Sequence, residues 1–252
     1  MSGHSKWKTI QHKKSAADAK RGQLFSKLAK ELMVVAKQGG GNPDTNATLR
    51  QLIQRCKSVS MPNDNIERAI KKGTGELAAA ALEEIGYEGF TVGGVGIVVK
   101  VLTDNKNRAA AEIRHIFTKH GSNFASQGSV SRGFKRKGQI FVDAASVPED
   151  QLLDIVLNAG GEDLQRDGDQ FEILTDPAAF EAVTQALEKA GIKPLSAEIR
   201  LVPDTYVPVT DKAVAQAVMR FVEELEDHDD VQAVYTNMDI SDEVLAQLEK
   251  ES

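Results

Sequence analysis

The sequence predicts an α+β multidomain protein: an N-terminal three-helix domain, a central α/β domain completed by the C-terminal segment, and an inserted ferredoxin-like α/β domain. Two observations support this. The chain of 252 residues is long enough for two or three domains, each with its own core. Apolar residues recur at helical spacing up to about residue 75, whereas β-branched runs begin near residue 84. We place the domains at 1–80, at 81–134 plus 204–252, and at 135–203.

The N-terminal domain is predicted to hold three helices. The first spans 15–38 and ends at GGGNP, because consecutive glycines favour a left-handed cap and proline cannot continue a helix. A second spans 45–59 and a third runs from Pro62 to Gly73. The inward arc of the first two helices is formed by Leu24, Leu28, Leu32, Val35, Leu49, Leu52, Ile53 and Cys56.

Strands and helices alternate in the rest of the chain. YEGFTV, GIVVKVLT and GSVSRGF are predicted strands, with a helix over 103–121 before the last of them. From 139 to 202 the order is strand, helix, strand, strand, helix, strand, which is the ferredoxin-like order, with Asp167–Gly168 at the hairpin turn. One helix and one strand of the tail return to complete the sheet that begins at residue 84.

Several chemistries lack the residues they need. Cys56 is the only cysteine, which excludes an internal disulfide and a thiolate zinc cage. The five histidines form no i, i+4 pair, and no hydrolase or kinase motif is present. No run reaches the roughly 20 apolar residues of a membrane helix, and the first thirty residues contain no secretory signal. We expect a cytoplasmic monomer with no catalytic residue, no metal and no cofactor.

Charge is distributed unevenly along the chain. Residues 1–75 contain 15 Lys and Arg against 5 Asp and Glu, a net charge of +10. The other 177 residues contain 16 against 32, a net charge of −16. A basic module joined to an acidic body indicates contact with a polyanion at one end, and an acidic body left free to meet a protein partner. A lysine-rich face that is only solvated is the alternative.

The opening arm and the first helix carry the candidate nucleic-acid-binding residues. Lysines suit phosphates; Trp7 either stacks on a base or fastens the arm to the domain, and Arg21 either contacts phosphate or pairs with a carboxylate. A looser second cluster follows the strand at 128–134. The main candidates are Lys6, Trp7, Lys8, His12, Lys13, Lys14, Lys20, Arg21, Lys27 and Lys30, and the second cluster is Arg132, Lys135, Arg136 and Lys137.

The acidic run EELEDHDD at 223–230 is predicted to be a solvated helix end or a partner surface. Because a polyanion repels acidic groups, we expect the basic end to face the nucleic acid and the acidic domains to face outward.

Ordered blocks of the sequence resemble the YebC family. They are GHSKW at 3–7, DAKRGQLFSKLAKEL at 18–32, GGGNPDTN at 39–46, MPNDNIERAIKKGTGE at 61–76, YEG at 87–89, LTDNKNRAAAEIRH at 102–115 and GSVSRGFKRKG at 128–138. Bacterial members are described as probable transcriptional regulators. Mitochondrial relatives are described as translational activators of cytochrome c oxidase.

This resemblance implies the same three-domain architecture and nucleic-acid binding without catalysis. The partner is then either duplex DNA at promoters or ribosomal RNA at a translating ribosome. We favour a DNA-binding transcriptional regulator, with a ribosome-associated translation factor as the first alternative. A protein-interaction adaptor that uses the acidic domains is the second.

Overall fold

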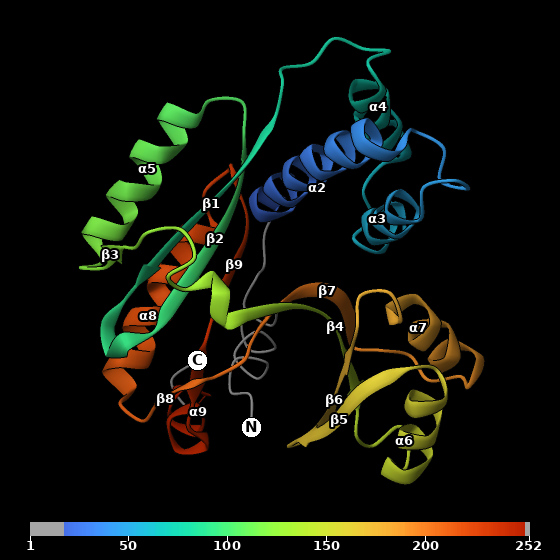
Figure 1. The fold of residues 1–252 in the computed structure, drawn as a ribbon, viewed down its shortest axis with the longest axis vertical. Helices are drawn as coiled ribbons and strands as arrows, with labels where there is room; N and C mark the ends of the chain where they lie inside the picture. The colour runs from blue at the N-terminus through green and yellow to red at the C-terminus, as the bar shows by residue number, and fades with distance from the viewer. Residues whose placement is uncertain (1–17, 250–252) are drawn as a thin grey trace.

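The computed structural model describes the backbone of residues 18–249 and the side chains of residues 21–248. Figure 1 shows three lobes, with the helical domain and the inserted domain on the same side of the central sheet. Each lobe has its own hydrophobic core, which confirms the predicted α+β multidomain class. Within the described part of the chain, no helix is both long and apolar enough to cross a membrane.

The helical domain is built from α2 (Asp18–Gly39), α3 (Ala47–Ser58) and α4 (Asn63–Thr74). Leu28 and Leu32 of α2 are buried against Leu49 and Cys56 of α3. Helices α2 and α4 cross closely at Gly73, where an added Cβ would lie 2.3 Å from the carbonyl oxygen of Met33. The predicted apolar arcs are therefore the faces that form this core.

The central domain is an antiparallel sheet in the order β3-β1-β2-β9. Helices α5 and α8 pack on one face of this sheet. Every residue of β2 except Lys100 is buried, as expected for a central strand covered on both faces. The elements are β1 (Glu83–Phe90), β2 (Gly96–Thr103), α5 (Lys106–Lys119), β3 (Asn123–Phe124), α8 (Lys212–Glu226) and β9 (Val231–Thr236).

The C-terminal segment completes this sheet, as predicted, because β9 pairs with β2. It also contributes elements that the sequence pattern did not reveal. Strands β8 (Val207–Val209) and β10 (Met238–Ile240) form a small parallel pair, and α9 (Asp242–Glu249) follows it. These strands are only three residues long, too short for an alternating pattern to show.

The inserted domain has strand order β5-β6-β4-β7, all antiparallel, with α6 and α7 contributing to one core. This is the ferredoxin-like arrangement. The hairpin loop is Gly168–Asp169, one residue later than predicted, because Gly168 takes the left-handed φ of +64°. The elements are β4 (Phe134–Asp143), α6 (Glu149–Asn158), β5 (Gly161–Asp167), β6 (Gln170–Thr175), α7 (Phe180–Lys189) and β7 (Ser196–Pro203).

The predicted strand GSVSRGF is wrong. Residues 128–130 form a turn, and Ser131–Gly133 form the short 3-10 helix η2. Glu88 of β1 causes this, because its carboxylate accepts the backbone N–H groups of Gly128, Val130 and Ser131 at 2.8–2.9 Å. Those N–H groups are thus not available to a strand ladder. The loop leads directly into β4, so Glu88 anchors the connection from the central to the inserted domain.

Candidate nucleic-acid interface

The predicted nucleic-acid-binding residues fall into two groups in the structure. Lys6, Trp7, Lys8, His12, Lys13, Lys14 and the side chain of Lys20 lie outside the described residues. Arg21, Lys27 and Lys30 lie on α2. Arg21 is exposed and forms no ion pair with the described part of the chain, whereas Lys27 and Lys30 are partly buried.

One face of α2 lies against the end of α8. The Lys27 ammonium group donates to the carbonyl oxygen of Glu226, and the Gln23 amide donates to the carbonyl oxygen of Asp227. Lys30 Nζ donates to the carbonyl oxygen of Asp229 at 3.0 Å and to Asp230 Oδ1 at 2.7 Å. We call Glu226–Asp230 the acidic turn. The acidic turn thus occupies Lys27 and Lys30, two of the α2 lysines that were predicted to bind phosphate.

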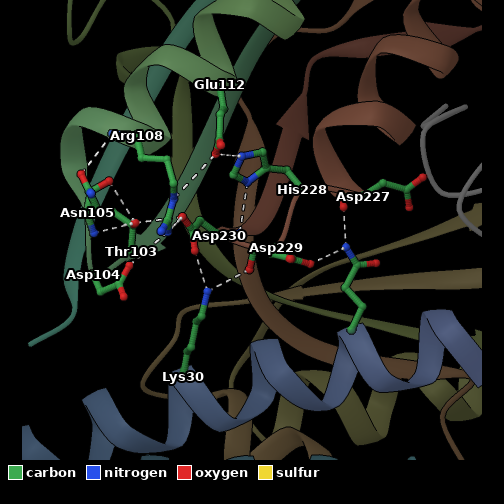
Figure 2. A network of polar contacts seen from close by, with 11 residues as sticks. Lys30, Thr103, Asp104, Asn105, Arg108, Glu112, Asp227, His228, Asp229 and Asp230 are labelled. Carbon is green, nitrogen blue, oxygen red and sulfur yellow. Dashed lines mark hydrogen bonds and ion pairs between the residues drawn. The ribbon is translucent and has the colours of Figure 1, made fainter. Parts of the chain in front are cut away.

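Asp230 is the centre of this contact (Figure 2). Its side chain is 5% exposed. While Oδ1 accepts Lys30, Oδ2 accepts the Thr103 hydroxyl and Arg108 Nη2, each at 2.8 Å. Burial alone would raise the pKa of Asp230, but the hydrogen bonds from Lys30, Arg108 and Thr103 outweigh it and lower the pKa to about 2.

The segment Thr103–Arg108 is shaped to present these donors. Asn105 caps α5 by accepting the Arg108 N–H at 3.1 Å, and its own N–H donates to the Thr103 hydroxyl oxygen at 3.0 Å. Arg108 also reaches Asp104 Oδ1 at 3.0 Å. The cap fixes the backbone at the start of α5, so that the Thr103 and Arg108 side chains converge on Asp230 (Figure 2).

Glu112, His228 and Asp230 lie close enough together to suggest a metal site. The Asp230 N–H donates to His228 Nδ1 at 3.1 Å, so in the neutral ring the proton is on Nε2. Nε2 lies 2.9 Å from Glu112 Oε2 and donates to it. Both ring nitrogens are thereby engaged, and Asp230 faces two cations. This arrangement favours a hydrogen-bond network that shapes the acidic turn.

A cleft of about 720 Å³ opens beside this network, between the helical and central domains. Its wall carries both signs of charge, with Lys30, Lys72 and Arg108 facing several carboxylates. Mixed charge does not select an anionic or a cationic ligand, so we assign no ligand to the cleft.

Burial shifts the ionisation of two α2 residues. It lowers the pKa of Lys27, against the attraction of Glu226, Asp227 and Asp229. It raises the pKa of Glu31, which pairs with Arg55 of α3 at 3.5 Å. Lys27 therefore lies in the contact between α2 and the acidic turn, whereas Glu31 and Arg55 pair within the helical domain.

The second basic cluster does not form one surface. Lys135 pairs with Asp204 at 2.9 Å and Lys137 pairs with Glu162 at 2.8 Å. Arg132 lies on η2 and Arg136 lies between the two lysines on β4, where successive side chains point to opposite faces. Two of the four cations are therefore neutralised by acidic residues.

The prediction of a solvated acidic run is correct for Glu223, Asp227 and Asp229, which are exposed, and wrong for Asp230. The acidic turn packs on α2, so this part of the acidic body lies against the basic helix. The expected orientation of the protein on a nucleic acid stays a prediction. Sequence reasoning missed Thr103 and Arg108 as partners of Asp230. The signal that could have drawn attention to them was the block LTDNKNR, which ends a strand and caps a helix.

The fold and this interface define a class of protein: a three-lobed α+β protein in which a basic helical domain is joined to an acidic body by charge-paired contacts. Family models agree. Residues 5–76 match the TACO1/YebC protein N-terminal domain, and residues 82–238 match the TACO1/YebC second and third domains. The chain belongs to the TACO1/YebC family, a non-enzymatic family of probable transcriptional regulators.

Relatives match over nearly the whole chain. A "probable transcriptional regulatory protein" of Dictyoglomus turgidum is 53% identical, covering 98% of this chain and all of the relative. A protein of the same description in Treponema pallidum is 51% identical, over 97% of this chain and all of the relative. A conserved hypothetical protein of Aquifex aeolicus has a crystal structure with a TM-score of 0.79 and 44% identity, covering 89% of this chain and 93% of that one.

Proposed function

We propose that this protein is a cytoplasmic nucleic-acid-binding regulator that acts on transcription by contacting DNA. The observation that carries this is the separation of charge, +10 over residues 1–75 against −16 over the rest. Relatives described as probable transcriptional regulatory proteins support the transcriptional setting. The bound form is a monomer, with the basic end against the phosphate backbone.

The proposed contacts are those of the opening arm and of α2. Lysines neutralise phosphates and release counterions, which supplies affinity without sequence specificity. Trp7 and His12 either order the arm or touch bases. The phosphate contacts are Lys6, Lys8, Lys13, Lys14, Lys20, Lys27 and Lys30, with Arg21 beside them. The second cluster, Arg132, Lys135, Arg136 and Lys137, extends this contact only where Lys135 and Lys137 leave Asp204 and Glu162.

A ribosome-associated translation factor is the second candidate, because the matching family models join YebC to TACO1. The same lysines would then contact ribosomal RNA. Phosphates attract lysines on either polymer, and only base edges or 2′-hydroxyls distinguish DNA from RNA. An adaptor that binds protein through the acidic domains would show neither contact.

Two assays test these candidates together. Gel retardation on duplex DNA should show affinity that falls with salt, with a log–log slope of roughly −5 or steeper if six or more phosphates are neutralised. Selection from random duplexes should then enrich a preferred sequence. Co-sedimentation with ribosomes at moderate salt, without a preferred duplex, would favour the translation factor. No binding in either assay would leave the adaptor.

A further inference from the structure

Three side chains on one face of α2 reach across to a single turn of another domain. They are Gln23, Lys27 and Lys30, spaced i, i+4 and i+7 along the helix. Such spacing keeps side chains on one side of an α-helix. All three donate hydrogen bonds to the acidic turn, Glu226–Asp230, about 200 residues later in the sequence.

The acidic turn offers the same kind of acceptor that a nucleic acid offers. Its carbonyl oxygens at Glu226 and Asp227 lie at the C-terminal end of α8, where the helix dipole is negative. Asp229 and Asp230 add carboxylate oxygens facing Gln23 and Lys30. A lysine ammonium group pairs with anionic oxygens of either kind.

Lys27 and Lys30 cannot hold the acidic turn and a nucleic acid at the same time. Lys27 and Lys30 are partly buried under the turn, and the Lys30 side chain is only 23% exposed. The turn occupies the hydrogen-bonding positions of both ammonium groups, so a duplex phosphate can replace it on them only when α2 and the turn separate.

Separation leaves no buried charge unpaired. When Lys30 departs, Asp230 still holds Thr103 and Arg108 through its other oxygen, Oδ2. Uncompensated burial of a charge is the main cost of breaking such a pair, and here it is avoided. The contact is thus built to open without unfolding the central domain.

We propose that the α2 face and the acidic turn form a latch that a phosphate polyanion opens by exchanging the acidic turn for its own phosphates on Lys27 and Lys30. This rests on the proposed function. In the closed form the acidic turn holds Lys27 and Lys30, and a polyanion displaces it by presenting several phosphates to them at once.

A reversible lock tests the latch. Gln23→Cys and Asp229→Cys place thiols on side chains that touch, Nε2 to Oδ1 at 3.2 Å, so a short bismaleimide can join them. Cys56 is fully buried and burial raises its pKa to about 11, so it stays unreactive. The comparison is the same variant capped with a monofunctional maleimide. Leu153→Cys with Leu157→Cys, exposed and one turn apart on α6, is the matched cross-linked control.

The probes are a labelled 30-base-pair duplex and a 30-nucleotide RNA. The locked protein should bind at least about tenfold more weakly than the capped one. Because two phosphate contacts are lost, its salt slope should be shallower by about 1.8 on the duplex and by about 1.4 on the single-stranded RNA. Cross-linking the α6 pair should change affinity less than about twofold. In the unlinked variant, saturating duplex should slow cross-linking of the latch pair.

The experiment distinguishes failure of the latch from failure of the proposed function. Equal affinity of locked and capped protein would overturn the latch and leave nucleic-acid binding intact. Absence of binding to either probe by the wild type would overturn the proposed function and the latch with it. Thiols that do not cross-link in the free protein would contradict the closed form.

Discussion

Lys30 Nζ lies 2.7 Å from Asp230 Oδ1, and this ion pair joins the first described helix to a turn 200 residues away in the sequence. Its two partners are not equivalent. The Lys30 side chain is 23% exposed and bonds to this turn, whereas Asp230 is 5% exposed and also holds Thr103 and Arg108.

This asymmetry predicts unequal mutant effects. Lys30→Met should lower the free energy of unfolding by about 1 kcal/mol, because Asp230 keeps two partners. Asp230→Ala should cost about 3 kcal/mol or more, since three donors lose one acceptor. Urea titration of each variant measures this. Asp229→Ala is the control: this exposed residue of the same turn accepts the Gln23 amide at 3.2 Å, and its loss should stay within about 0.5 kcal/mol. Equal losses in the free energy of unfolding for the Lys30 and Asp230 variants would contradict the central position of Asp230 in this network.

Glu88 should be a strong determinant of stability. It is 5% exposed, and its carboxylate accepts the N–H groups of Gly128, Val130 and Ser131 and the Ser131 hydroxyl. Glu88→Gln replaces an acceptor oxygen by an amide that faces donors, at a cost of roughly 2–4 kcal/mol in urea unfolding.

The control for this change lies on the same strand. Glu84→Gln removes the same charge from a side chain that is 61% exposed and 3.9 Å from Lys100, so a loss below about 0.5 kcal/mol is expected. If the two variants unfold alike, Glu88 does not anchor the loop.

Acid should remove the Glu88 contribution within a defined pH range. Burial would raise the pKa of Glu88, but the hydrogen bonds from Gly128, Ser131 and Val130 lower it from 4.5 to about 2. A lowered pKa stabilises the fold above the unfolded value and loses this contribution as pH falls through the folded value. We expect roughly 3 kcal/mol to disappear between about pH 4.5 and 2. Glu88→Gln, titrated in parallel, should lack that part of the decline; an unchanged decline would show that other groups cause it.

Two glycine substitutions should have opposite signs. At Gly73 an added Cβ would lie 2.3 Å from the Met33 carbonyl oxygen and 2.9 Å from Ala36 Cβ, so Gly73→Ala should cost about 1–3 kcal/mol by forcing α2 and α4 apart. At Gly22, in the same domain, nothing lies within 4 Å. Gly22→Ala should stabilise α2 by about 0.5–1 kcal/mol. Thermal unfolding of both variants measures these changes in stability. If both variants are stabilised, the crossing of α2 and α4 is loosely packed.

Deleting residues 1–14 tests the opening arm. It removes four proposed phosphate contacts, Lys6, Lys8, Lys13 and Lys14, so the salt slope on duplex DNA should become shallower by about 3.6. Affinity should fall while the unfolding midpoint stays unchanged, because the core residues of all three lobes in the described part of the chain lie at Leu24 and beyond. Unchanged affinity would move the binding site away from the arm.

Much of the fold was predictable from local patterns. The arcs containing Leu28 and Leu49 and the alternation of the inserted domain depend on spacing within one element, which the sequence displays directly. The loop at 128–133 was mispredicted, because its shape depends on Glu88, which is 40 residues from Gly128. Strands β8 and β10 were missed because three residues carry no measurable period.

The candidate site divides in the same way. The lysines of the first helix and the run of acids at 223–230 are visible in the sequence, because charge and helical angle are properties of neighbouring residues. That Lys30 and Asp230 meet is visible only in the folded chain. Their pairing requires the C-terminal segment to return through β9 to the sheet begun by β1 and β2, and no local pattern records which distant surface a charged face will meet.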